Sequence, residues 1–334
     1  MSQVHLSRLP ATVLVQVMLS TPTVHLDPLS NSFTTYQASL LLASLSSQGR
    51  STSRSNLRLS HLTLCNCSLT SVSPELMTSL ANLDSFTTSL VEFSPVQLEV
   101  MLKALTSPKS QLKALTLPDY YCTRLATKTL QPEILATALA SLHSLCYGGH
   151  VPDQLWKMMA EGKTKIRRIQ VARSFLIEHP SADILARAIN SLEEIDFEKN
   201  FPDDDESEHA DCFDGSQVIE IFERMSRGTS VRKLTLEISE ENILNHLELP
   251  SGLFARALIN VEEVIIDVMD GGAFYAEIVE LLQHIRVSEP SALQKLELRV
   301  KSSTKRKLSL CSDLVSDVVL NLEHLNLLGC LEIE

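Results

Sequence analysis

Two cysteine–histidine pairs are close enough in the sequence to suggest nucleophilic chemistry. Cys65 follows His61 by four residues, and His150 follows Cys146 by four. A cysteine nucleophile needs a histidine within hydrogen-bond reach and a third group that orients the histidine. Cysteine on a repeated strand is far more often simply a small residue. We therefore expect no catalytic residues in this chain.

Metal and cofactor sites are not indicated either. Cys65 and Cys67 have no second Cys or His pair that would complete four zinc ligands. Residues 202–214 hold a run of acids, but not in the alternating order, with a central Gly and a final Glu, that calcium loops use. The crowded like charges instead predict a solvated loop. There is no Gly-rich phosphate loop, so we expect no cofactor.

The overall charge limits the classes of partner. The chain has 334 residues, a formal net charge of -12 and a sequence pI of about 5.3, so nucleic acid and anionic membranes are poor candidates. Seven cysteines, an odd number, favour a reducing, cytoplasmic location. Residues 11–19 are apolar but too short to span a membrane. They fit a first helix or cap better than a signal peptide, because Gln16 interrupts them and no good cleavage site follows.

The elements that would position any site come from a repeated pattern. The string at 182–197, a helix end that leads into Leu-x-x-Ile-x-Phe, recurs with the same spacing at 134–147 and 253–266. Ten frames of apolar-x-x-apolar-x-apolar begin at Leu59, Leu83, Leu112, Leu142, Ile166, Leu192, Val231, Val261, Leu293 and Leu322. A further candidate frame begins at Thr21. Helical spacing between the frames predicts a strand and a helix in each unit, hence a parallel sheet with helices on one face.

Stacking should bury the apolar residues of each frame, because one repeat cannot cover its own apolar face. A small residue stands four positions before many frames and lets the helix end approach the sheet: Ser79, Ala138, Ala188 and Ala257. The core is predicted to contain Leu115, Leu117, Ile169, Val171, Leu234, Leu236, Leu296 and Leu298. At the end of the chain, either Leu331–Ile333 covers the last strand or the sequence is part of a longer protein.

The frames resemble the leucine-rich repeat family, specifically its ribonuclease-inhibitor-like, intracellular class. The ninth position of that repeat, Asn or Cys, is matched by Cys67, Asn200 and Cys330. The resemblance implies an α/β fold: a right-handed, horseshoe-shaped solenoid with a concave parallel sheet and convex helices. About ten repeats would occupy 57–334, with the acidic insertion at 202–214. Residues 1–56 would form a helical cap or a degenerate first repeat.

In this repeat geometry, the third, fifth and seventh frame positions point from the concave face into solvent. The third positions alternate in sign and should neutralise one another: Arg168, Glu194, Lys233, Glu263 and Lys295. The fifth position of the sixth frame adds Asp196. The seventh positions are three acids in a row, Glu198, Glu237 and Asp267, before Arg299. We predict that a basic segment of a partner docks along these acids, although a merely solvated surface fits the pattern equally well.

By resemblance, such an array is a non-catalytic scaffold for protein–protein interaction. Arrays of this kind also serve as recognition arms of innate-immune receptors or as F-box substrate adaptors of ubiquitin ligases. Leu9-Pro10-x-x-Val13-Leu14-x-x-Val17 looks like the start of an F-box. An F-box needs three helices, whereas a candidate strand is already reached at Val24.

Overall fold

The computed structural model describes fourteen segments of the chain. They are residues 10–26, 35–48, 59–65, 68–89, 91–117, 131–147, 151–170, 180–197, 215–239, 249–269, 275–287, 292–301, 308–329 and 331–333. Several sequence-based predictions fall outside them: Glu198, the acidic insertion 202–214, Val171, His150 and the ninth-position residues Cys67, Asn200 and Cys330.

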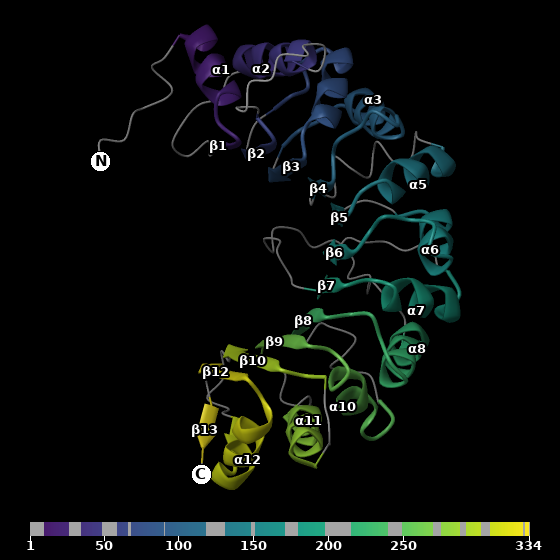
Figure 1. Ribbon diagram of the computed structural model, residues 1–334, viewed down its shortest axis with the longest axis vertical. Coiled ribbons are helices and arrows are strands. Elements are labelled where there is room, and N and C mark those ends of the chain that lie inside the picture. Colours follow the sequence, from purple (N-terminus) through teal and green to yellow (C-terminus); the bar gives the residue numbers. More distant parts are fainter. Residues whose placement is uncertain are drawn as a thin grey trace. The chain divides into compact units, whose positions relative to one another are not determined.

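The chain forms two compact units, the first mainly from residues 1–155 and the second mainly from 156–334. The first unit holds a parallel sheet in which neighbouring strands are also neighbours in sequence (Figure 1). Its strands are β1 (Thr23–Leu26), β2 (His61–Cys65), β3 (Ser85–Ser89), β4 (Ala114–Leu117) and β5 (Ser144–Tyr147). Its helices are α1 (Ala11–Leu19), α2 (Thr35–Gln48), the 3-10 helix η2 (Pro74–Asn82), α3 (Pro95–Leu105) and α5 (Pro132–Ala140).

The second unit repeats the same plan of parallel strands with helices along one face (Figure 1). Its sheet contains β6 (Arg168–Gln170), β7 (Glu194–Phe197), β8 (Lys233–Ser239), β9 (Glu263–Met269), β10 (Lys295–Lys301) and β12 (His324–Gly329). Its helices are α7 (Ala182–Asn190), α8 (Gly215–Ser226), α10 (Leu253–Leu258), α11 (Tyr275–Val287) and α12 (Ser312–Asn321). The division between the units falls within α6 (Asp153–Ala160).

Every one of the ten frames leads into a strand, and the predicted parallel α/β architecture is confirmed. The predicted core residues within the described segments are all buried: Leu115, Leu117, Ile169, Leu234, Leu236, Leu296 and Leu298. So are the small residues that precede the frames: Ser79, Ala138, Ala188 and Ala257. The register aligns equivalent positions, for example Leu234 with Val264 and Val264 with Leu296. The sequence period therefore maps directly onto columns of stacked side chains.

One frame has a polar residue where the others have an apolar one. Thr88 occupies the last apolar position of the frame at Leu83, and it is only 2% exposed. Its hydroxyl donates a hydrogen bond to the carbonyl oxygen of Thr116 on β4, at 3.2 Å. Because a buried hydroxyl is tolerated when it is hydrogen-bonded, the strand forms in spite of the substitution.

Both ends of the repeat pattern form strands in the structure. Residues 23–26 form β1, which pairs with β2 at Val24–Leu62 and Leu26–Leu64, so the additional frame at Thr21 is a strand of the sheet. Among the described residues, α1 alone precedes that strand, whereas an F-box would need three helices. At the other end, Leu331–Ile333 forms β13, which pairs with β11 (Leu308–Leu310) in a separate two-stranded sheet. It does not pair with β12, as one of the two alternatives for the end of the chain would have it.

A buried glutamine at the third residue of a helix ties neighbouring repeats together. Gln97 of α3 completes a capping box with Ser94, and its amide nitrogen donates to the carbonyls of Leu69 and Val72, each at 2.6 Å. Gln217 of α8 occupies the same helix position and donates to the carbonyl of Pro180 at 3.3 Å. Both side chains are buried. In both cases the acceptor carbonyls lie just before the helix of the preceding repeat, η2 or α7, and the amide gives them the donors that buried carbonyls need.

Candidate functional site

The helix-free face of the second unit's sheet carries most of the residues that the sequence singles out. Arg168 Nη2 lies 3.1 Å from Glu194 Oε1, and Lys233 Nζ lies 2.8 Å from Glu263 Oε1. The register places each pair on adjacent strands. The self-neutralising third column is thus confirmed for these four residues. All four side chains are about a third or more solvent-exposed, so each pair contributes about 0–1 kcal/mol.

A second column of alternating charges, which the sequence analysis missed, runs beside the first at the second frame position. Arg167 Nε lies 3.7 Å from Glu193 Oε1, and Arg232 Nε lies 3.9 Å from Glu262 Oε1. The pairs join the starts of β6 and β7, and of β8 and β9. Reading the second position of the same frames would have revealed this column, since its signs alternate as those of the third do.

The seventh column differs from its prediction at Asp267. This residue is 3% exposed, and its Oδ2 lies 3.3 Å from Arg299 Nη1 on the neighbouring strand β10. Arg299 Nε also donates to Glu297 Oε1 at 2.8 Å. The expectation that Asp267 is an uncompensated, solvent-facing acid is wrong, because the register sets Arg299 directly beside it and the long side chain reaches the carboxylate.

In the cluster of Asp267, Arg299 and Glu297, the two carboxylates favour the charged form of the arginine. The Glu297 carboxylate raises the pKa of the Arg299 guanidinium, and the Asp267 carboxylate raises it further against the opposing effect of burial. One guanidinium thus serves two carboxylates. Asp267 Oδ1 is buried without a hydrogen-bond partner among the described residues. The cluster has a structural role and leaves Asp267 inaccessible to a partner's side chain.

The structure describes the remaining predicted binding residues only in part. Asp196 is half-buried at the fifth position on β7. Glu237 lies on β8 in register with Asp267, but its side chain is not among those described. Ile265 and Thr235, both fifth-position residues, are buried rather than solvent-facing. The middle of the face at β8 and β9 is therefore less accessible than the repeat geometry alone predicts.

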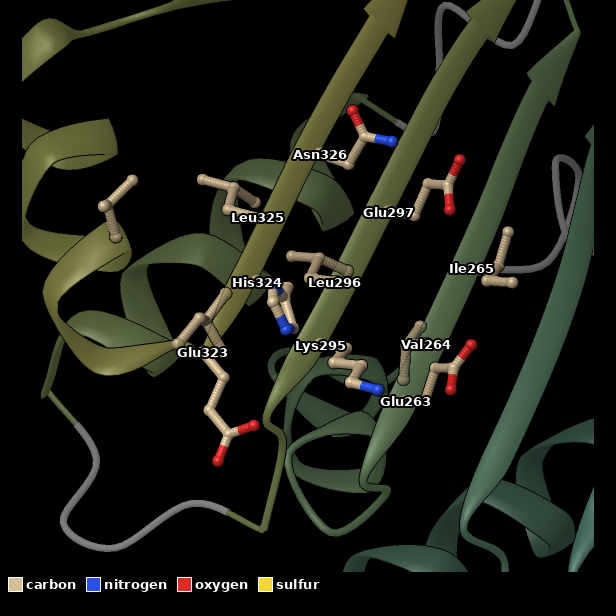
Figure 2. A pocket seen from close by; sticks show the side chains of 12 residues that line it. Glu263, Val264, Ile265, Lys295, Leu296, Glu297, Glu323, His324, Leu325 and Asn326 are labelled. Atoms are coloured by element: carbon tan, nitrogen blue, oxygen red, sulfur yellow. The ribbon is translucent and has the colours of Figure 1, made fainter.

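The last strand adds residues that the sequence analysis did not include in the face. His324, Asn326 and Leu328 continue the third, fifth and seventh columns on β12, next to Lys295, Glu297 and Arg299. All three β12 residues are exposed, and Leu328 is 46% exposed. A pocket of about 540 Å³ lies here, and its polar lining residues are Glu263, Lys295, Glu297, Glu323, His324 and Asn326 (Figure 2).

The cysteine–histidine pair in the first unit is poorly placed for catalysis. His61 and Cys65 are the two ends of the extended strand β2. Four residues of strand span about 13 Å, which is far beyond hydrogen-bond reach between a base and a nucleophile. Within the described segments, no three His, Cys, Asp or Glu residues are grouped so that they could hold a metal ion. Helices long and apolar enough to cross a membrane are likewise absent from those segments.

Comparison with known proteins yields a likeness of fold. No protein-family model matches the sequence, and no curated protein matches it. Among solved structures, the chain is similar to the crystal structure of an internalin from Listeria monocytogenes. The alignment covers 89% of this chain and 76% of that one, with 14% sequence identity and a TM-score of 0.41. The likeness concerns the fold alone.

Proposed function

We propose that this protein is a non-catalytic scaffold that binds another protein on the helix-free face of its second unit. The observation that carries the proposal is the nature of that face. Charged and polar residues stand in register on hydrogen-bonded strands, so the backbone positions that carry them are fixed relative to one another. A backbone that is already ordered adds no folding cost to binding, which favours recognition of a complementary surface.

The repeat type and location are part of the same proposal. We assign the repeats to the ribonuclease-inhibitor-like class of leucine-rich repeats, because strands alternate with helices of up to 14 residues in the described segments. A cytoplasmic location is supported by the odd number of cysteines, seven in all. Neither assignment requires a cofactor.

The part of a partner that approaches β7 and β8 is proposed to be basic. The net charge of -12, together with Glu198, Glu237 and the acidic insertion 202–214, supports this. Glu194, Glu263 and Asp267 contribute less than their sequence positions suggest, because each is already held by a cation of a neighbouring strand. The acids on which a basic segment would depend are therefore Glu198, Glu237 and those of the insertion.

The experiment compares partner capture by the full chain and by two variants. The double variant Glu198→Gln, Glu237→Gln should retain less of any protein that the native chain retains, and the loss should be greatest at low salt. The control is Lys157→Gln on α6, an exposed helix residue outside the face. Equal capture and equal salt dependence in all three proteins would count against a basic partner segment on β7 and β8.

A further inference from the structure

A row of four charged residues borders the second unit's sheet at the edge where its strands begin. Arg167, Glu193, Arg232 and Glu262 stand immediately before β6, β7, β8 and β9, in that order. Glu193 N donates a hydrogen bond to Arg167 O, and Arg232 N donates one to Glu193 O, each at 2.7 Å. The backbone therefore sets the order of the charges along this edge. We call these four residues the edge row.

The sign of the charge changes from each strand to the next. The first residue of each strand has the same sign as the edge-row residue before it, so every strand start carries two like charges. The couples are Arg167 and Arg168, Glu193 and Glu194, Arg232 and Lys233, and Glu262 and Glu263. Adjacent strands of a sheet lie about 4.8 Å apart. The edge row is thus neutral as a whole and alternates in charge with the period of the strands.

The edge-row side chains are exposed, and the ion pairs between them are long. Between 49% and 70% of each side chain is exposed. The N–O distances are 3.7 Å for Arg167–Glu193 and 3.9 Å for Arg232–Glu262, longer than a hydrogen bond. Because exposed ion pairs of this kind bind weakly, the same side chains can accept a second opposite charge.

The alternation of charge selects the kind of partner. A polyanion such as nucleic acid, or a uniformly basic protein segment, would meet a like charge at every second strand, which opposes binding. A surface that matches the edge row along its whole length must itself alternate in charge with the strand spacing. Another copy of the edge row has this pattern, because its strands have the same spacing.

A two-fold axis between β7 and β8 brings opposite charges of two copies together. The rotation reverses the strand order, so that β6 of one copy faces β9 of the other and β7 faces β8. Arg167 then faces the second copy's Glu262. Glu193 likewise faces the second copy's Arg232. An axis through a strand would instead set an edge-row residue against itself.

We infer that a second copy of this chain binds along the edge row, about a two-fold axis between β7 and β8. Ser191 and Ser230 lie two residues before Glu193 and Arg232, and both are exposed, so the chain beside the axis presents small side chains there. The net charge of -12 on each copy opposes association, so the dimer is weak, with a Kd of about 10–100 μM. The inference goes beyond the proposed function, since both the surface and the occupant are different.

The test is sedimentation velocity of the full chain at about 0.15 M salt, where the repulsion between net charges is screened more than contacts at ion-pair distance. Variant A, Arg167→Glu with Arg232→Glu, makes the edge row uniformly acidic. Variant B, Glu193→Arg with Glu262→Arg, makes it uniformly basic. Each variant alone should dimerise at least about tenfold more weakly than the native chain. An equimolar mixture of A and B should form a heterodimer at least as tight as the native dimer.

The control is Lys109→Glu with Lys157→Glu, which changes the net charge as variant A does, at exposed positions outside the edge row. It should leave Kd within about twofold of the native value. The milder variant Arg167→Gln with Arg232→Gln, which introduces no like charges, should raise Kd about three- to tenfold.

The inference is overturned if the native chain stays monomeric up to about 1 mM, or if the control weakens the dimer as much as variant A does. Native-like dimers of A and of B, or a mixture of folded A and B that does not associate, would also overturn it. Native assemblies larger than a dimer would overturn it in favour of an open, head-to-tail arrangement.

Discussion

The guanidinium of Arg299 lies 3.3 Å from the buried carboxylate of Asp267, and the two residues are direct register partners on β10 and β9. Asp267 is 3% exposed, whereas a third of the Arg299 side chain reaches solvent. The acid is therefore the buried member of the pair, and the arginine connects it to the surface. A residue that looks like a binding acid in the sequence instead holds two strands together.

Removing the arginine should leave the buried carboxyl group of Asp267 without the cation beside it. We expect Arg299→Met to lower the free energy of unfolding by about 1–3 kcal/mol, measured by urea denaturation. Lys295→Met is the matched control, because it removes a cation from the same face of the same strand. Its effect should be within about 0.5 kcal/mol of zero. Equally small effects of the two substitutions would show that the Asp267–Arg299 pair is not structural.

Gln97 should be far more important for stability than an ordinary helix glutamine. Gln97→Met keeps most of the buried volume but removes the donor to the carbonyls of Leu69 and Val72. Because both carbonyls then lose that partner, we expect a loss of about 2–4 kcal/mol in the free energy of unfolding. Gln111→Met, at an exposed position of the same unit, should change it by less than about 0.5 kcal/mol. Denaturant unfolding curves of the two variants would distinguish these outcomes.

Glu277 is the third residue of α11, as Gln97 is of α3 and Gln217 is of α8. Its Oε2 is buried without a hydrogen-bond partner among the described residues. Burial raises the pKa of this carboxyl, and the nearby Glu280 raises it further. Protonated Glu277, which can donate a hydrogen bond as glutamine does, is therefore more favoured in the folded protein than in the unfolded chain.

The sign of the pH effect follows from that raised pKa. Since the folded pKa exceeds the unfolded one, the contribution of Glu277 to stability is present in acid and is lost as pH rises through the folded pKa. Glu277→Gln should therefore stabilise the protein at pH 7, by less than about 1 kcal/mol because solvent screens a half-buried carboxyl, and the gain should shrink as pH falls toward the unfolded pKa. Glu133→Gln, at an exposed site on α5, should show no such trend. Thermal unfolding between pH 4 and 8 tests this, and a pH-independent difference would contradict it.

Much of the fold followed from the period of the apolar residues. The frames at Leu112 and Val231, for instance, gave strands β4 and β8 with their leucines buried. Apolar residues at alternate positions of a strand all lie on the same face of the sheet, so that face has to be covered. The frame at Leu83 also gave a strand, and the hydrogen bond from Thr88 to Thr116 explains how its polar residue is accommodated. The pairing of β13 with β11 could not be foreseen, since a three-residue apolar segment fits several neighbours equally well.

The candidate face was predictable in its columns but not in its charges. The sequence alone determined that Arg168, Glu194, Lys233, Glu263 and Lys295 share one column, because the repeat period sets which residues become neighbours. Only the tertiary structure decided that Glu263 is held by Lys233 rather than by Lys295, and that Asp267 is buried against Arg299. A column of alternating charges allows each acid two partners. The choice between them depends on side-chain reach and burial across the assembled strands, quantities that exist only once the repeats have stacked.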